Sequence, residues 1–266
     1  LMLRSIKEKA KDDKDLFTGT FKIDFLDKPI TKKIIDCDIP CISGNSIRGK
    51  LRRLIMHDFI KLIGLSNMKK RVYHMLFSGG ILDKALDILD FKEIDEMIMN
   101  CPPIGILGSA LGNVTIEGEL KVAWAYPLCL ERGNSNYSFE TMLDTVFQTR
   151  SDSSKQEKEI KFVDEEKKKK DEQSQQMKYE YEVFRPGTIF EHQFAITTEN
   201  ELLLSCFYRM LNLYKENASI CGLSSVGNSE IEFINLSYDE SKENLYLNYL
   251  NENKEKIKEY FENFKF

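Results

Sequence analysis

Residues 44–71 of the 266-residue chain gather side chains that could bind an anion. The segment contains a single carboxylate, Asp58, and eight cations: Arg48, Lys50, Arg52, Arg53, Lys61, Lys69, Lys70 and Arg71. Its formal net charge is +7, whereas the whole chain carries −5, so the remainder carries −12. A basic segment on an acidic protein predicts a polyanionic partner that binds at one surface.

The basic segment is predicted to open with a helix. Candidate N-cap residues are Ser43, Asn45 and Ser46, and apolar residues then recur every three or four positions from 47 to 63. The spacing places Arg48 and Arg52 on the flank opposite most of this apolar stripe, with Lys50 and Arg53 nearby. Because a helix amino end offers free N–H groups and partial positive charge, we expect a phosphate site at this helix start. The alternative is a solvated helix face.

A second charged region, residues 150–178, differs in kind. It contains nine cations, eight anions and only four aliphatic or aromatic residues. Such a segment cannot bury enough apolar surface to fold alone, so we expect a mobile insertion. The open alternatives are a solvated loop and an arm that becomes ordered on a partner.

The residues that usually hold metals do not form a recognisable metal motif. The three histidines, His57, His74 and His192, show no HxxxH spacing, and Cys37 and Cys41 lack a second pair at zinc-site spacing. We expect no metal and no cofactor.

The elements that must position these residues alternate between strand and helix periodicity. Four strands are expected: 16–25, 114–130, a third formed by 179–184 and 188–198 with a break at Pro186-Gly187, and 231–236. Amphipathic helices are expected at 47–63 and 199–215. A helical insertion at 65–103 is expected to close at Pro102-Pro103, and a glycine-rich turn to follow at 104–113. Without the insertions the order is βαββαβ, so we predict an α+β, ferredoxin-like (RRM-like) palm. We expect one domain over 1–266, with a helical insertion at 65–103, a long thumb-like insertion at 148–178 and a C-terminal helical tail at 239–266.

Composition excludes several classes of protein. No window approaches 18 consecutive apolar residues, and the first 16 residues are charged, so neither a membrane span nor a secretory signal is expected. Six cysteines are too few for a disulfide scaffold. We expect a cytoplasmic protein with reduced thiols.

Three segments together resemble a known family. They are IPCISGNSIRGKLRRLI (39–55), QMKYEYEVFRPGTIFEH (176–192) and CGLSSVGNSEIEF (221–233). They are similar to segments of the CRISPR-associated RAMP superfamily, specifically the Cas-seven-type subunits that form the repeated backbone of effector complexes. Types IV and I-D resemble the chain most, and type III is the further possibility.

The resemblance implies an RNA-binding role for residues in three places. The helix start corresponds to the segment that holds guide phosphates: Ser43, Gly44, Asn45, Ser46, Arg48, Lys50, Arg52 and Arg53. The superfamily's glycine-rich loop corresponds to Gly222, Ser224, Ser225, Gly227 and Asn228, with Gly227-Asn228 replacing a Gly-x-Gly end. The insertion corresponds to the thumb hairpin, where Gln148, Arg150 and Met177 would contact RNA.

The resemblance also implies a function and partners. The chain would be a guide-RNA-binding subunit that polymerises along the RNA by sequence-independent phosphate contacts and presents it for pairing in antiviral defence. Its partners would be CRISPR guide RNA, complementary target nucleic acid, copies of itself and other effector subunits, with no membrane.

Two enzymatic alternatives stay open beside this binding role. Target-cleaving relatives use an aspartate before the first helix, where this chain has Asp27, Asp36 and Asp38; a carboxylate there could bind a divalent ion as in a metal-dependent endoribonuclease. Guide processing would instead use His57 as general acid or base. A third possibility is an enzyme for a small phosphate ligand.

Overall fold

The computed structural model describes residues 6–7, 22–23, 31–34, 37–82, 90–112, 114–150, 177–221 and 229–264. The chain forms two compact units, one from Leu1–Pro40 and Pro127–Ile189 and the other from Cys41–Tyr126 and Phe190–Phe266. Short strands β9 (Tyr126–Pro127) and β12 (Phe190–Glu191) lie where the chain passes between the units. The mixture of helices and small sheets confirms the α+β class. No helix in these described ranges is both long and apolar enough to cross a membrane.

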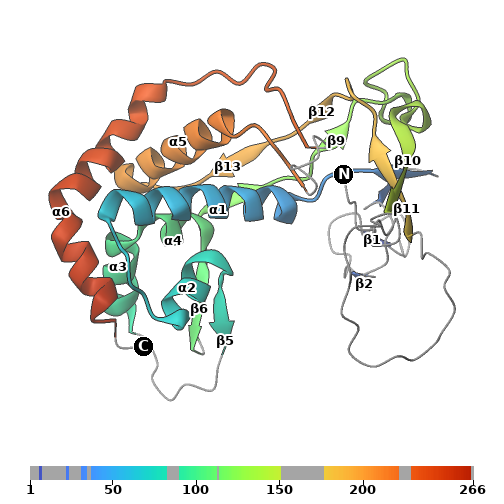
Figure 1. Ribbon diagram of the computed structural model, residues 1–266. Coiled ribbons are helices and arrows are strands. Elements are labelled where there is room, and N and C mark those ends of the chain that lie inside the picture. Colours follow the sequence, from blue (N-terminus) through green and yellow to red (C-terminus); the bar gives the residue numbers. More distant parts are fainter. Residues whose placement is uncertain are drawn as a thin grey trace, which may run out of the picture. The chain divides into compact units, whose positions relative to one another are not determined.

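The second unit is built on helix α1 (Gly44–Ile63), which confirms the helix predicted at 47–63 (Figure 1). The helix begins because the Ser43 side chain accepts a hydrogen bond from the Ser46 backbone N–H at 3.2 Å, and it ends at Gly64, whose φ of 68° is left-handed. Most of its apolar stripe is buried, and Leu51 and Phe59 have no exposed surface.

Two further helices cover this stripe. Helix α5 (Glu201–Glu216) confirms the helix expected at 199–215, and α6 (Asn244–Glu262) is the helix expected in the tail. The Phe59 and Phe261 rings meet edge to face at 5.9 Å, which joins α1 to α6. A 3₁₀ turn, η4 (Glu240–Glu243), leads into α6.

The remaining elements of this unit differ in part from the prediction. Residues 65–103 contain α2 (Lys70–Phe77), β5 (Gly80–Leu82) and α3 (Phe91–Asn100). Pro102 does not close the insertion but starts helix α4 (Pro102–Leu107), because proline fits the first helical position. The expected turn at 104–113 is therefore wrong: its apolar residues Ile104, Ile106 and Leu107 are buried in α4, and β6 (Ser109–Gly112) follows.

The strands of this unit are short. Strand β6 pairs with β5 in parallel and with β7 (Val114–Ile116) antiparallel, while β8 (Leu120–Val122) pairs with β13 (Phe194–Ile196) antiparallel. The single strand expected over 114–130 is broken at Gly118, where a Cβ would lie 2.4 Å from the Gly108 backbone nitrogen. The strand expected at 231–236 is wrong, since only an isolated bridge joins Ser219 to Glu230. The described strands form two-stranded sheets and one three-stranded sheet, so the ferredoxin-like palm is not confirmed.

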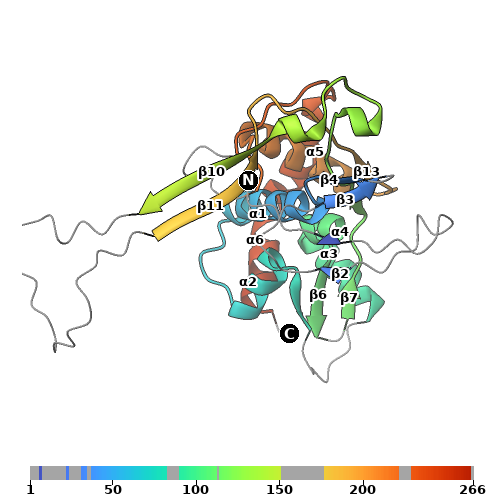
Figure 2. The same cartoon turned by 90° about the vertical axis from the view of Figure 1, so that its right-hand side faces the viewer.

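The first unit holds three antiparallel strand pairs. Strands β1 (Ile6–Lys7) and β2 (Lys22–Ile23) pair, as do β3 (Thr31–Ile34) and β4 (Cys37–Pro40). The 3₁₀ turns η1 (Leu130–Arg132) and η2 (Phe139–Met142) precede a long hairpin. In that hairpin β10 (Leu143–Arg150) pairs with β11 (Met177–Phe184) along its whole length (Figure 2).

Candidate functional site

The amino end of α1 is packed against the backbone of β8. Gly44 is buried, and a Cβ at this position would lie 2.3 Å from the Val122 carbonyl oxygen. Ser43 is also buried and uses its hydroxyl oxygen to cap Ser46, whereas Asn45 is exposed. Close approach therefore requires glycine at 44, and Asn45 and Ser46 are the residues of this turn that reach solvent.

Arg48 and Arg52 point into the protein and not toward solvent, which corrects the expected position opposite the apolar stripe. Arg48 donates to the carbonyl oxygens of Leu120 at 2.6 Å and Leu107 at 2.8 Å. Arg52 is only 9% exposed, and its guanidinium donates at 2.6–3.2 Å to three carbonyl oxygens, those of Leu76, Leu107 and Gly108. The cause is the carboxyl end of α4, which presents carbonyls without helical partners and partial negative charge.

Burial disfavours the charged form of both guanidinium groups. It lowers the pKa of Arg48, and it lowers the pKa of Arg52 to about 10, with the neighbouring charge of Arg48 adding to the effect. Both groups remain protonated at neutral pH. Their charge is used to hold α1 against α4.

A different set of cations follows the outer side of α1. We call Lys50, Arg53 and Lys61 the basic row; His57 lies between the last two, so the four side chains recur at helical spacing. Within the described ranges, no member of the basic row makes an ion pair with a carboxylate. These four residues are separated by 3, 4 and 4 positions in the sequence, so their common helix face could have been recognised. The sequence prediction instead treated Lys50 and Arg53 as one group with Arg48 and Arg52.

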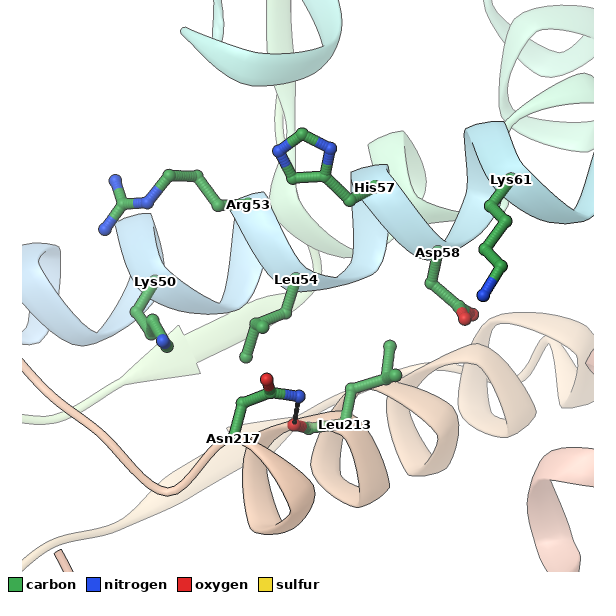
Figure 3. Close-up of a pocket in the computed structure, with 8 residues that line it drawn as sticks. All are labelled: Lys50, Arg53, Leu54, His57, Asp58, Lys61, Leu213 and Asn217. Carbon is green, nitrogen blue, oxygen red and sulfur yellow. Dashed lines mark hydrogen bonds between the residues drawn. The ribbon is translucent and has the colours of Figure 1, made fainter. Parts of the chain in front are cut away.

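The basic row borders a shallow groove of about 350 Å³ between α1 and α5. Figure 3 shows Lys50 and Leu54 directed toward α5, where Leu213 and Asn217 form the other wall, and Arg53 and His57 on the opposite edge of α1. Leu213 and Asn217 were missed by sequence reasoning, because only the fold brings α5 beside α1.

The carboxylate of Asp58 does not cancel the charge of the basic row. Asp58 accepts hydrogen bonds from Arg209 Nε at 2.9 Å and Nη2 at 2.7 Å, and Glu243 accepts from the same guanidinium at 3.2 Å. Hydrogen bonding to Asp58 raises the pKa of Arg209 further. The only carboxylate of the basic segment is thus committed to joining α1, α5 and the start of α6.

Lys50 brings two of the sequence motifs together. Its Nζ donates to the Ser219 hydroxyl at 2.7 Å. Ser219 lies two residues before the predicted glycine-rich loop at 221–228, which we call the Gly/Ser loop. The two ends of that loop are joined by hydrogen bonds, with the Ile220 N–H donating to the Ser229 carbonyl at 2.9 Å. The predicted loop residues lie outside the described residues: Gly222, Ser224, Ser225, Gly227 and Asn228. The loop therefore starts and ends beside the basic row.

The other predicted RNA contacts belong to the first unit. Gln148, Arg150 and Met177 lie in the β10–β11 hairpin, where Arg150 pairs with Met177 at the end of the ladder. Most of the charged insertion, 151–176, lies outside the described residues.

The structure describes only some of the candidate catalytic residues. Asp27 and Asp36 lie outside the described residues, and Asp38 is exposed in β4. Across the described ranges, no three His, Cys, Asp or Glu side chains are grouped as metal ligands. His57 packs on Phe77, and His192 contacts the Ala123 carbonyl at 3.1 Å.

Comparison with known proteins gives a likeness of fold. No protein-family model matches the sequence, and no curated protein matches it. The fold is similar to that of a chain in a solved structure described as "Type IV-B CRISPR Complex", with a TM-score of 0.55 over 85% of this chain and 84% of that one. Sequence identity is 17%, so the likeness is one of fold.

Proposed function

We propose that this chain is a guide-RNA-binding backbone subunit of a multisubunit CRISPR effector complex. The fold likeness to a chain of a Type IV-B CRISPR complex, extending over most of both chains, supports membership of such an assembly. The three sequence segments that resemble the Cas-seven-type backbone point to the same role. Its partners would be guide RNA, complementary target nucleic acid, further copies of the chain and other effector subunits.

The basic row is the observation that carries the RNA-binding part of the proposal. Lys50, Arg53 and Lys61 lie along one helix of a chain whose net charge is −5, and they make no ion pair with any carboxylate that the structure describes. The basic row attracts a polyanion, and the net negative charge of the rest of the chain repels it. The polyanion is therefore expected to bind along the basic row. These cations contact phosphates and not base edges, as a guide of variable sequence requires.

The roles of the helix residues are divided in this proposal. Lys50, Arg53, Asn45 and Ser46 contact phosphate, together with the Gly/Ser loop that begins near Ser219. Arg48, Arg52, Ser43 and Gly44 hold α1 in position for these contacts. The proposed RRM-like palm would comprise α1 and α5 with β8 and β13, and the hairpin of β10 and β11 would be the thumb that carries Gln148, Arg150 and Met177.

Binding of labelled single-stranded RNA tests the proposal. We expect the purified chain to bind two oligonucleotides of equal length and unrelated sequence with similar affinity, and to carry co-purified RNA visible in its 260/280 nm absorbance ratio. The double variant K50E/R53E should weaken binding roughly 10-fold or more at 0.1 M salt, because it removes two phosphate contacts and adds repulsion.

The matched control is K92E/K256E, which reverses two exposed lysines on α3 and α6. It makes the same change in net charge away from the basic row and should bind nearly as the wild type does. Absence of RNA binding by the wild type, or equal loss in both double variants, would refute the assignment.

A further inference from the structure

Three aromatic side chains form a cluster beside the basic row, and we call them the ring cluster. The Tyr73 ring stacks on Phe77 with centroids 4.8 Å apart and planes 29° apart. Phe77 in turn contacts His57 of α1 at 4.8 Å. The cluster is therefore continuous from α2 to the outer side of α1.

The ring cluster remains open to solvent. Tyr73 is 48% exposed, and His57 is also exposed, although buried aromatic surface would be more favourable for stability. Exposed aromatic side chains that adjoin one another are candidates for contact with a ligand, whereas single exposed ones are ordinary.

The backbone beneath the ring cluster is fixed. Arg52 Nη1 donates to the Leu76 carbonyl at 3.2 Å, and the Ser109 hydroxyl donates to the Met75 carbonyl at 2.8 Å. Val72, Met75 and Leu76 are fully buried on the inner side of α2. Tyr73 and Phe77 thus lie on a helix that is anchored to α1 and β6. Ligand binding would therefore cost little free energy for ordering the backbone of α2.

The cations next to the ring cluster indicate what class of ligand it binds. His57 lies four residues after Arg53 and four before Lys61, so the ring cluster lies level with the middle of the basic row. A flat apolar surface adjoining cations fits a single-stranded nucleic acid, whose phosphates need the cations and whose unpaired bases need stacking partners.

We propose that the ring cluster of Tyr73, Phe77 and His57 stacks an unpaired base of the strand whose phosphates contact the basic row. The proposal rests on the proposed RNA-binding function and adds a site on α2 to it. Stacking tolerates every base, since each has a π-face, so the site is compatible with a guide of any sequence.

Comparison of ordinary and abasic oligonucleotides tests the stacking directly. Two labelled single strands of equal length and charge are used, one with all bases and one abasic at every position. Tyr73→Ala should weaken binding of the base-containing strand by roughly 5- to 150-fold, the range for one base–aromatic stack, and leave the abasic strand within about twofold.

Three further variants separate stacking from structure. Tyr73→Phe and Tyr73→Trp keep a ring and should retain wild-type affinity within about threefold, while Tyr73→Leu keeps apolar bulk without a π-face and should behave as Tyr73→Ala does. Phe91→Ala removes another exposed ring, 87% exposed on α3, and should leave both affinities unchanged. Circular dichroism of each variant verifies folding.

The outcomes distinguish the two proposals. If the wild type binds neither strand, the proposed RNA-binding function fails. If the wild type binds both strands but Tyr73→Ala weakens neither, or weakens both equally, the stacking site is refuted and phosphate binding by the basic row stands.

Discussion

The Nη2 atom of Arg52 donates a hydrogen bond of 2.6 Å to the carbonyl oxygen of Leu107, the last residue of α4. A buried cation thereby closes the carboxyl end of a short, fully buried helix. The same guanidinium reaches Leu76 at the end of α2 and Gly108 before β6. One side chain of α1 thus fixes three segments of the second unit.

Loss of Arg52 should reduce stability strongly. Arg52→Ala leaves the buried carbonyls of Leu76 and Gly108 without a charged donor, and the expected cost is about 2–5 kcal/mol in the free energy of unfolding. Urea denaturation followed by circular dichroism measures it. Arg53→Ala, next in sequence but exposed, should change stability by less than about 0.5 kcal/mol. Equal unfolding midpoints for the two variants would contradict the structural role of Arg52.

Two glycines in the first turns of α1 should respond oppositely to alanine. At Gly44 the new Cβ would lie 2.3 Å from the Val122 carbonyl oxygen, so α1 must shift away from β8 at a cost of about 1–3 kcal/mol. At Gly49 the nearest atom is Arg53 Nη1 at 3.7 Å, and alanine should stabilise the helix by about 0.5–1 kcal/mol. Thermal melts of Gly44→Ala and Gly49→Ala measure the two shifts; melting temperatures that move together would show that packing against β8 does not restrict position 44.

The helices of the second unit could be predicted from the sequence because their signals are local. Ser43 as N-cap, the apolar stripe to Ile63 and the spacing of α5 all lie within the helices they specify. The direction of each cation could not be predicted in this way. Arg52 points inward because it donates a hydrogen bond to the carbonyl of Leu107 at the end of α4, 55 residues away in sequence. That contact exists only in the folded chain.

The failed predictions have the same cause. Residues 231–236 alternate as a strand would, yet form none, because pairing depends on a neighbouring strand that the fold does not supply. A proline such as Pro102 is compatible with the end of one helix and with the start of the next. Here it starts α4, because the apolar residues that follow it are buried as a helix. The helices were therefore predicted correctly, while the separation of inward Arg48 and Arg52 from the outer basic row required the three-dimensional structure.

Alkaline pH should destabilise the protein through a buried thiol. Burial raises the pKa of Cys206 well above its ordinary value near 9, so the folded state keeps a proton that the unfolded chain releases. The stabilisation is complete below about pH 9 and is lost as pH rises toward the folded-state pKa, by about 1.4 kcal/mol per pH unit. Between pH 9 and 10.5, the free energy of unfolding of Cys206→Ala should fall with pH less steeply than that of the wild type, with slopes that differ by about 1.4 kcal/mol per pH unit.

The comparison of slopes isolates this effect. Cys206→Ala leaves a small cavity that lowers stability at every pH, which shifts the curve without changing its slope. Urea midpoints measured at half-unit pH intervals give both slopes under reducing conditions. Parallel curves would show that the Cys206 thiol ionises equally in both states.

Salt dependence should count the cations of the basic row that touch phosphate. For single strands the logarithm of the binding constant falls with the logarithm of salt concentration by about 0.7 for each neutralised phosphate. Lys61→Gln keeps a similar side-chain length and removes one charge, so its slope should be shallower than that of the wild type by about 0.7. Titrations of labelled RNA between 50 and 300 mM salt, conditions chosen to keep binding measurable, give each slope. Lys256→Gln, an exposed lysine on α6, should retain the wild-type slope, whereas an unchanged slope in Lys61→Gln would place the RNA path away from the carboxyl half of α1 and confine phosphate contacts to the region of Lys50 and Arg53.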